Sequence, residues 1–357
     1  MKQGKTLKRI SALLMAFLLL PVFTVAQEPQ NASLTVPNGN FEKGKEEWEM
    51  RLSTDYYEIV EEDGNSFLRI KKKTSVFSSP LDVPVGETFV WIFDMRSAET
   101  MSVTIRFLNE NDEKVKDVRQ YCPLSPNAWA TYKAIATAPE NTHSMQLMLS
   151  ADKDMVVDYD NVRVEKLEAP SGDIVENGNM ETLAENNLPK NFTIQGEGCT
   201  VTETAGHSGK ALKISTNDET AEVTVGTAWI ALKAGEKYDL SAYMNLTELT
   251  EGSNGVCLEL YKIASPLSSR TRETGTSYFK AITYEDGTKM GWRKMMIPRS
   301  SLSASGLYEL RVTFKGKGTV YLDDFAAVTT NDIVRNGDFE GFSADFTPAG
   351  KWNHVGD

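Results

Sequence analysis

The chain has 357 residues, 38 of them basic and 50 acidic, so its formal net charge is −12. This acidic balance argues against binding to nucleic acid, whose phosphates need a basic face, and against binding to anionic membrane surfaces. The length suggests about two domains that need no disulfide framework. For the three cysteines, Cys122, Cys199 and Cys257, a bridge between Cys199 and Cys257 and free buried thiols are both open.

The first 26 residues predict a secretory signal peptide. Basic residues at positions 2, 5, 8 and 9 precede an apolar run over 12–20, and small residues follow around Ala26. That run is too short to cross a bilayer of ~30 Å as a helix, and no later stretch is apolar enough to do so. We therefore expect cleavage after Ala26, no membrane insertion, and a secreted protein that is periplasmic or extracellular.

A short signature, Asn-Gly-x-hydrophobic-Glu, occurs three times, at residues 38–42, 177–181 and 336–340. The segments between the copies also align in order, which indicates repeats of one module. We expect a first module over 27–168 and a second over 174–329. The remainder, 331–357, holds the start of a third module. It is too short to bury a core alone, so either the chain is cut short at Asp357 or this tail packs on the second module.

Period-two alternation of apolar and polar residues predicts strands in both modules. It runs through 102–107, 146–149, 238–243, 256–261 and 309–314, with Gly, Asn, Asp and Pro between the runs. No long helical period appears. The expected fold class is all-β, with tandem antiparallel β-sandwich domains of the jelly-roll kind.

Three stretches carry a family resemblance. They are the repeated signature, the turn at 206–210 (Gly-His-Ser-Gly-Lys) and the module ending at 321–325 (Tyr-Leu-Asp-Asp-Phe). Together they resemble the galactose-binding-like jelly rolls of carbohydrate-binding modules, families four, nine, sixteen and twenty-two. The resemblance implies a structural calcium near the joined first and last strands, a saccharide site on a concave face or among the loops, and a partner enzyme that degrades polysaccharide.

We therefore expect an exported, non-catalytic carbohydrate-binding protein that captures a polysaccharide or oligosaccharide. The alternative is a structural or adhesive β-sandwich module that spaces other domains or binds a protein. The short connections between the modules are compatible with this second interpretation.

Carboxylates near the two ends of each module are candidate metal ligands. Glu42 with Asp160, and Glu181 with Asp323, would be adjacent if the first and last strands pair. Two close carboxylates repel unless one is protonated or a cation lies between them, and calcium, a hard ion with oxygen ligands, would meet that need. The alternative is that these acids cap turns and face solvent.

Candidate saccharide contacts gather in the second module. A pyranose ring needs a flat apolar face, together with polar groups for its hydroxyls. The long polar stretch 265–287 is the preferred contact region, because functional residues often lie on loops. The candidates are Tyr243, Tyr261, Tyr278, Tyr284, Arg270 and Arg272. Trp129 and Trp292 recur at one place in both modules, which favours a core role for them.

Catalysis has little support in the sequence. The three histidines, His143, His207 and His354, make neither a serine triad nor a histidine metal site. Accidental acid pairs are numerous among 50 carboxylates. The repeat explains the paired acids better than a glycosidase centre does, because they occur in both modules. We expect no enzyme activity and no cofactor other than calcium.

Overall fold

The computed structural model describes residues 34–169, 172–202, 206–250, 253–264, 270–280, 289, 291–330 and 341–342. Those residues form strands and turns, without a helix, and all strand pairs but one are antiparallel. The expected all-β class and tandem sandwich architecture are confirmed. No helix of the described part is long and apolar enough to cross a membrane.

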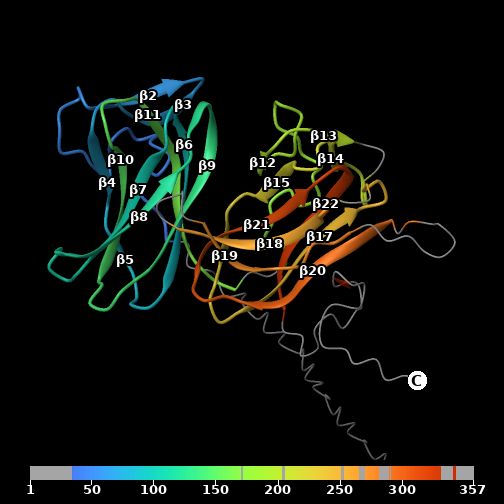
Figure 1. The fold of residues 1–357 in the computed structure, drawn as a ribbon. Coiled ribbons are helices and arrows are strands. Elements are labelled where there is room, and N and C mark those ends of the chain that lie inside the picture. Colours follow the sequence, from blue (N-terminus) through green and yellow to red (C-terminus); the bar gives the residue numbers. More distant parts are fainter. Residues whose placement is uncertain are drawn as a thin grey trace, which may run out of the picture. The chain divides into compact units, whose positions relative to one another are not determined.

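The first sandwich has two sheets, drawn in blue to green in Figure 1. One sheet has the strand order β1-β4-β10-β7-β8, with β5 also on β10, and the other has the order β2-β3-β11-β6-β9. Its strands are β1 (Trp48–Glu49), β2 (Tyr57–Glu62), β3 (Asn65–Ile70), β4 (Thr74–Ser78), β5 (Leu81–Asp82), β6 (Thr88–Ser97), β7 (Met101–Leu108), β8 (Lys114–Cys122), β9 (Ser125–Thr137), β10 (Ser144–Ala151) and β11 (Val157–Lys166).

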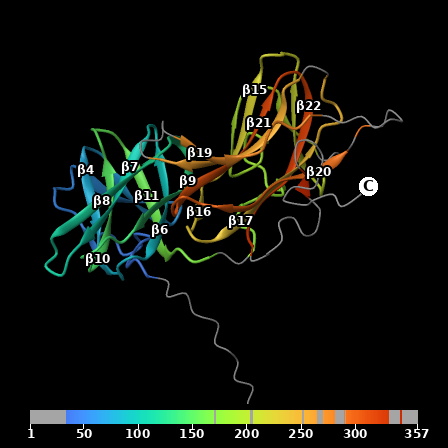
Figure 2. The same cartoon turned by 60° about the horizontal axis from the view of Figure 1, so that its bottom comes forward.

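The second sandwich also has two sheets, drawn in yellow to red in Figures 1 and 2. One has the order β12-β15-β21-β18-β19, with β16 on β21, and the other has the order β13-β14-β22-β17-β20-β23. Its strands are β12 (Phe192–Gln195), β13 (Cys199–Thr202), β14 (Ala211–Thr216), β15 (Glu222–Thr227), β16 (Ile230–Leu232), β17 (Lys237–Asn245), β18 (Gly255–Ile263), β19 (Arg270–Gly275), β20 (Trp292–Ser301), β21 (Gly306–Lys315), β22 (Gly318–Thr329) and β23 (Gly341–Phe342).

The two sandwiches repeat strand for strand. The order β1-β4-β10-β7-β8 returns as β12-β15-β21-β18-β19, and β2-β3-β11-β6-β9 returns as β13-β14-β22-β17-β20. The strands β1 to β11 fall inside the expected span 27–168 and β12 to β22 fall inside 174–329, whereas β23, which pairs with β20, lies in the remainder 331–357. Those boundaries themselves remain predictions, and the third signature copy, 336–340, lies outside the described residues.

Each sandwich has its own apolar core, built by the alternation of residues along its strands. On β21, for example, Leu310, Val312 and Phe314 are fully buried and face the opposite sheet. Burying such a side chain stabilises the fold by roughly 1.5–3 kcal/mol. The residues between them, at alternate positions, must then face outward, and they build the site described below.

The Asn-Gly signature explains how the last strand closes the second sandwich. A Cβ added at Gly178 would stand 2.0 Å from the Phe325 carbonyl oxygen on β22. The Phe325 N–H donates to the Gly178 carbonyl at 2.9 Å. Asn177 donates its side-chain amide to the Thr182 carbonyl, and Met180 is fully buried in the core. Glycine is required because any side chain would separate the two backbones.

The first copy of the signature has the same geometry. A Cβ at Gly39 would stand 2.0 Å from the Val162 carbonyl oxygen, and the Val162 N–H donates to the Gly39 carbonyl at 2.8 Å. Phe41 is fully buried and packs on Trp48, with ring centroids 4.9 Å apart. The signature is therefore a strand-closure device in both sandwiches.

Cys122 and Cys257 are both buried and both free. Burial raises the pKa of the Cys257 thiol to about 11, so this thiol stays protonated at neutral pH. Of the two alternatives that the sequence left open, the structure has the free buried thiol at Cys257.

Candidate functional site

The outward face of the sheet β12-β15-β21-β18-β19 carries an unusual set of charged residues. Glu309, Arg311 and Thr313 alternate on β21 with the core residues, and Glu259 and Tyr261 do the same on the neighbouring strand β18. Glu309 is fully buried and Glu259 is 9% exposed. Acidic residues are rarely buried unless they are paired, so their partners decide what this face can do.

Glu309 is the centre of the network. Its carboxylate accepts hydrogen bonds from Arg270 Nη1 at 2.8 Å, Arg311 Nη2 at 2.6 Å and Thr193 Oγ1 at 3.1 Å. Gly226 makes room for it, since a Cβ at that position would stand 2.4 Å from Glu309 Oε1. Four strands, β12, β15, β19 and β21, thus converge on one carboxylate.

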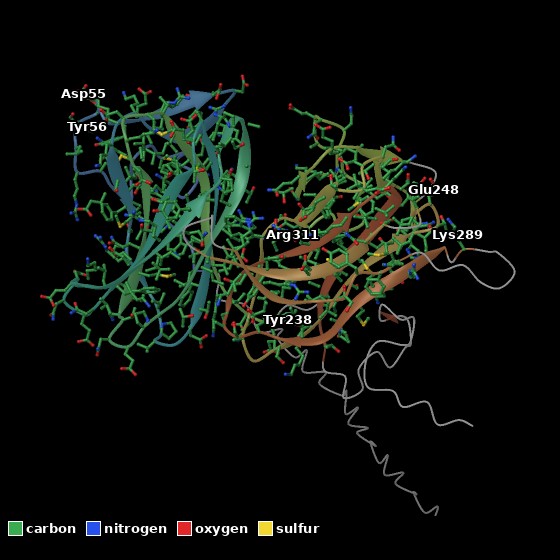
Figure 3. All side chains as sticks on the ribbon, in the orientation of Figure 1. Asp55, Tyr56, Tyr238, Glu248, Lys289 and Arg311 are labelled. Atoms are coloured by element: carbon green, nitrogen blue, oxygen red, sulfur yellow. The ribbon has the colours of Figure 1, made fainter. Side chains whose placement is uncertain are left out.

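Arg311 also lies over an aromatic ring. Its guanidinium carbon is 4.6 Å from the centroid of the Tyr261 ring, which is within the range of a cation–π interaction. Burial raises the pKa of the Tyr261 hydroxyl. The side chain of Arg311, labelled in Figure 3, is only 14% exposed, so the guanidinium is held between a carboxylate and a ring.

A second ion pair lies next to the first. Arg272 Nε donates to Glu259 Oε1 at 2.7 Å, and Thr313 Oγ1 donates to the other oxygen at 3.1 Å. We call the surface formed by Glu259, Tyr261, Arg270, Arg272, Glu309 and Arg311 the arginine face. Its polar groups hold one another in place through these hydrogen bonds and ion pairs.

The structure brings together three of the six residues predicted to contact saccharide, because Tyr261, Arg270 and Arg272 all lie on the arginine face. Tyr278 lies near Lys315, whose Nζ is 5.9 Å from the centroid of its ring. Lys315 continues the outward row of β21. Tyr278 is therefore at one end of the same sheet surface.

The other two predicted residues lie elsewhere. Tyr243 is on β17, in the opposite sheet, where its ring stacks on His207 with centroids 3.7 Å apart. Tyr284 lies outside the described residues. The roles of all six remain predictions.

The expected core role of Trp129 and Trp292 is wrong in detail. Both are only partly buried and neither joins the apolar cores. Trp129 packs edge-on against Phe67, and Trp292 packs edge-on against His207. The recurrence reflects a shared place on β9 and β20, outside the apolar core of each sandwich.

Sequence reasoning missed the central residues of the site, Glu309, Arg311 and Glu259. A usable pattern was present, because the run 309–315 alternates Glu, Arg, Thr and Lys with buried apolar residues. Period-two charge on a central strand indicates an outward surface that needs internal pairing. What the pattern lacks is the pairing of β21 with β18, which places these charges beside Tyr261.

The carboxylate pair of the second sandwich holds a turn. Asp323 accepts the backbone N–H groups of His207 and Ser208 at 2.9 and 3.0 Å. Glu181 accepts the N–H of Lys210 at 2.7 Å. Asp323 is fully buried, and that burial raises its pKa to about 6 despite the backbone donors. The Lys210 N–H instead lowers the pKa of Glu181.

The pair of the first sandwich does the same with different donors. Glu42 accepts the Ser66 N–H at 2.9 Å, and Asp160 accepts the Asn65 side-chain amide at 2.9 Å. Burial raises the pKa of Asp160, and the nearby Glu42 charge adds to that effect. In both sandwiches the signature glutamate and the last-strand aspartate therefore hold the same turn.

These pairs meet only part of what calcium needs. Calcium takes six to eight oxygen ligands. Among the described residues no group of three or more His, Cys, Asp or Glu side chains is placed to hold a metal. Each pair supplies two carboxylates whose oxygens already accept N–H donors. The raised pKa of Asp323 shows a buried carboxylate whose charge is poorly compensated, and calcium at these positions stays a prediction.

The corresponding sheet of the first sandwich has a hollow of about 510 Å³ on its outer face. Arg51 and Arg106 line it, and both guanidinium carbons also lie near the Phe77 ring, 5.0 and 5.4 Å from its centroid. Each arginine has a carboxylate of its own, Arg51 with Glu49 and Arg106 with Asp117. Lys114 and Arg119 also lie near Asp117, and Glu47 and Asp112 line the hollow, so the basic and acidic groups of this surface balance as a set.

No family model matches the chain, and no curated protein matches it. Solved structures similar to it include the N-terminal tandem of CBM22 domains of Xyn10C from Paenibacillus barcinonensis. That match is 14% identical, covers 82% of this chain and 96% of that one, and has a TM-score of 0.30. TmCBM61 in complex with β-1,4-galactotriose is 15% identical over 45% of this chain and 100% of that one, with a TM-score of 0.31.

A family 16 carbohydrate-binding module is 13% identical over 37% of this chain and 99% of that one, with a TM-score of 0.30. Families twenty-two and sixteen are among those that the sequence resembles. At these identities and TM-scores, the matches assign no role to any residue of this chain.

Proposed function

We propose that this protein binds carbohydrate through the arginine face of its second sandwich. The observation that carries the proposal is the contact between Arg311 and Tyr261 beside the buried carboxylate of Glu309. A half-buried ring offers apolar contact to a sugar ring, and guanidinium and carboxylate groups offer donors and acceptors for hydroxyls.

The network supports this role because its polar groups are already ordered. Glu309 has three donors and Glu259 has two. A ligand that meets such a surface does not need to order these side chains first, so less conformational entropy is lost on binding. Apolar residues of similar size often stabilise a protein as well as a buried ion pair does, so stability alone would not require this network.

We further propose that the protein is exported, with residues 1–26 removed as a signal peptide, and that it acts without catalysis beside an enzyme that degrades polysaccharide. The chemistry of the arginine face supports binding rather than hydrolysis, because each buried carboxylate accepts hydrogen bonds from an arginine. Sequencing the N-terminus of the secreted protein tests the export, and a reducing-sugar assay on bound polymers tests the lack of activity.

The carboxylate pairs Glu42 with Asp160 and Glu181 with Asp323 remain our proposed calcium ligands. Their proximity to the closing strands and the raised pKa of Asp323 support this role. A bound ion would favour the charged form of Asp323 and fix the 206–210 turn, so its contribution would be structural.

The experiment that tests carbohydrate binding is affinity electrophoresis of the secreted chain in gels that contain soluble plant, bacterial or host polysaccharides. The proposal predicts that at least one polymer slows migration, and that free oligosaccharide of the same kind restores it. Unchanged mobility across a broad panel would contradict the proposal.

One observation favours the second candidate, a structural or adhesive module. Among the described residues the exposed large apolar side chains are aliphatic, namely Leu52, Val85, Leu124 and Val156, so an open aromatic platform is missing from that part of the surface. Recovery of a defined protein partner, together with no retention by any polysaccharide, would support this candidate.

A further inference from the structure

We infer that the saccharide bound by the arginine face carries negative charge, as a uronate carboxylate or a sulfate ester does. This inference rests on the proposed function and names the class of its ligand. It follows from the balance of charge at the centre of the face and from the contrast with the first sandwich.

Two guanidinium groups share one carboxylate at the centre of the arginine face. Arg270 Nη1 and Arg311 Nη2 both donate to Glu309 Oε2, at 2.8 and 2.6 Å. Glu309 supplies one negative charge against two positive ones, so this cluster has a net charge of about +1 because arginine stays protonated at neutral pH. The next pair, Arg272 with Glu259, is balanced and adds no negative charge.

Arg311 also has hydrogen-bonding capacity that the protein does not use. Its Nε is buried and is one of the few buried side-chain nitrogens of the described part without a hydrogen-bond partner. Buried donors are rarely left without an acceptor. The Arg270 side chain is 24% exposed, so an anionic oxygen can meet the pair of arginines there and supply the missing negative charge.

The chemistry of arginine specifies the class of ligand. A guanidinium group presents several N–H donors in one plane, which matches the paired oxygens of a carboxylate or sulfate. The arginines here are held in place from both sides, Arg311 by Tyr261 and Glu309, and Arg270 by Glu309. A saccharide could therefore lay its ring near Tyr261 and direct its acidic group to the pair of arginines.

The first sandwich provides an internal contrast. On its corresponding face Arg51 pairs with Glu49 and Arg106 pairs with Asp117. Lys114 and Arg119 also lie near Asp117, and Glu47 and Asp112 line the hollow, so four basic groups are offset by four acidic ones. That surface carries no excess of positive charge. The chain as a whole has a net charge of −12. The excess positive charge on the arginine face of the second sandwich is therefore a local feature and does not reflect the overall composition.

The test uses matched pairs of polymers that differ only in charge, with the full secreted chain. The pairs are polygalacturonate and its methyl ester, glucuronoxylan and its carboxyl-reduced form, and heparan sulfate and its desulfated, carboxyl-reduced form. We expect retention by at least one acidic polymer, with about a tenfold or greater loss of affinity for its neutral partner, because a hydrogen bond to a charged group contributes about that factor. Retention should also weaken as salt is raised.

Substitution then locates the effect. Arg270→Gln should lower affinity for the acidic polymer by about tenfold and reduce the salt dependence, whereas Arg270→Lys should retain part of the binding. Arg51→Gln, on the first sandwich, is the matched control and should leave affinity unchanged. The melting temperature of each variant shows whether it folds. If Arg270→Gln does not fold, the comparison of acidic and neutral polymers with the wild-type chain still tests the preference for charge.

The outcomes separate the two proposals. Equal retention by an acidic polymer and its neutral partner, or retention by neutral polymers alone, would overturn the inference and leave carbohydrate binding standing. Retention by none of these polymers and by none of a broader neutral panel would overturn both.

Discussion

Arg311 lies over Tyr261, with its guanidinium carbon 4.6 Å from the ring centroid, and at the same time donates to the buried carboxylate of Glu309. One side chain thereby joins an aromatic ring to an ion-pair network on the outward face of a sheet. Glu309 is buried and paired, so it should contribute to stability, and it also holds Arg311 in the position proposed for binding.

Glu309→Gln should destabilise the second sandwich strongly. It removes the only charge that offsets Arg270 and Arg311 in their shared contact, and breaking a buried ion pair costs about 3–5 kcal/mol. The measurement is the free energy of unfolding in urea. Glu49→Gln is the control, since the side chains of the Arg51–Glu49 pair are 63% and 49% exposed, and it should change stability by less than about 1 kcal/mol. If Glu309→Gln lowers the free energy of unfolding by as little as Glu49→Gln does, the buried network contributes no stability beyond that of an exposed ion pair.

Gly178→Ala should disrupt closure of the second sandwich. The new Cβ would stand 2.0 Å from the Phe325 carbonyl oxygen, which belongs to the backbone and has little freedom to move. We expect a loss of more than about 2 kcal/mol, as for other overpacked sites. Gly291→Ala is the control, because a Cβ there meets nothing within 4 Å, and it should be close to neutral. A tolerated Gly178→Ala would contradict the strand-closure role of the signature.

The stability of the second sandwich should depend on the protonation of Asp323. Its pKa in the folded protein is about 6, above the ordinary value of 3.8, so the folded state binds the proton more tightly than the unfolded state. The stabilisation is present below pH 4 and is lost as the pH rises from about 4 to about 6. The measurement is the difference in unfolding free energy between the wild type and Asp323→Asn, in chelator, across that range.

That difference should change in favour of the variant as the pH rises, because only the wild type must ionise a buried group. A difference that is flat from pH 4 to pH 7 would show that the Asp323 carboxylate ionises as easily in the folded state as in the unfolded state.

Calcium should raise the melting temperature at neutral pH, and chelation should lower it. An ion that binds only the folded protein stabilises it in proportion to the logarithm of its concentration over its Kd. Glu181→Gln should remove the response of the second sandwich without removing the fold, because its side chain is 38% exposed. If neither calcium nor chelator changes the melting temperature, these acids only hold the turn and do not bind calcium.

The sequence was sufficient to predict the fold, because its decisive features are local and repeated. Gly39 and Gly178 recur with their neighbours, and the alternation on β21 and β18 marks strands without any long-range information. The signature contacts the last strand in both sandwiches, through Gly39 with Val162 and Gly178 with Phe325, which meets the condition on which the proximity of the two acids depended.

The site could be predicted only in part. Tyr261, Arg270 and Arg272 were found because they lie in or beside one long polar stretch. Glu309 and Arg311 are separated from them by about 40 residues of sequence and meet them only through the pairing of β18 with β21. Tyr243 was predicted to contact saccharide together with Tyr261. The two tyrosines lie on consecutive strands, β17 and β18, but these strands belong to different sheets, and the sequence does not reveal that separation.

The most direct test of the central claim compares Tyr261→Ala with Tyr243→Ala by isothermal titration of the saccharide that retains the wild-type chain. Loss of an aromatic contact should weaken binding by about tenfold or more in Tyr261→Ala, with the melting temperature close to that of the wild type. Tyr243→Ala should keep the wild-type Kd. Unchanged binding by Tyr261→Ala, or an equal loss in Tyr243→Ala, would contradict the assignment of the site to the arginine face.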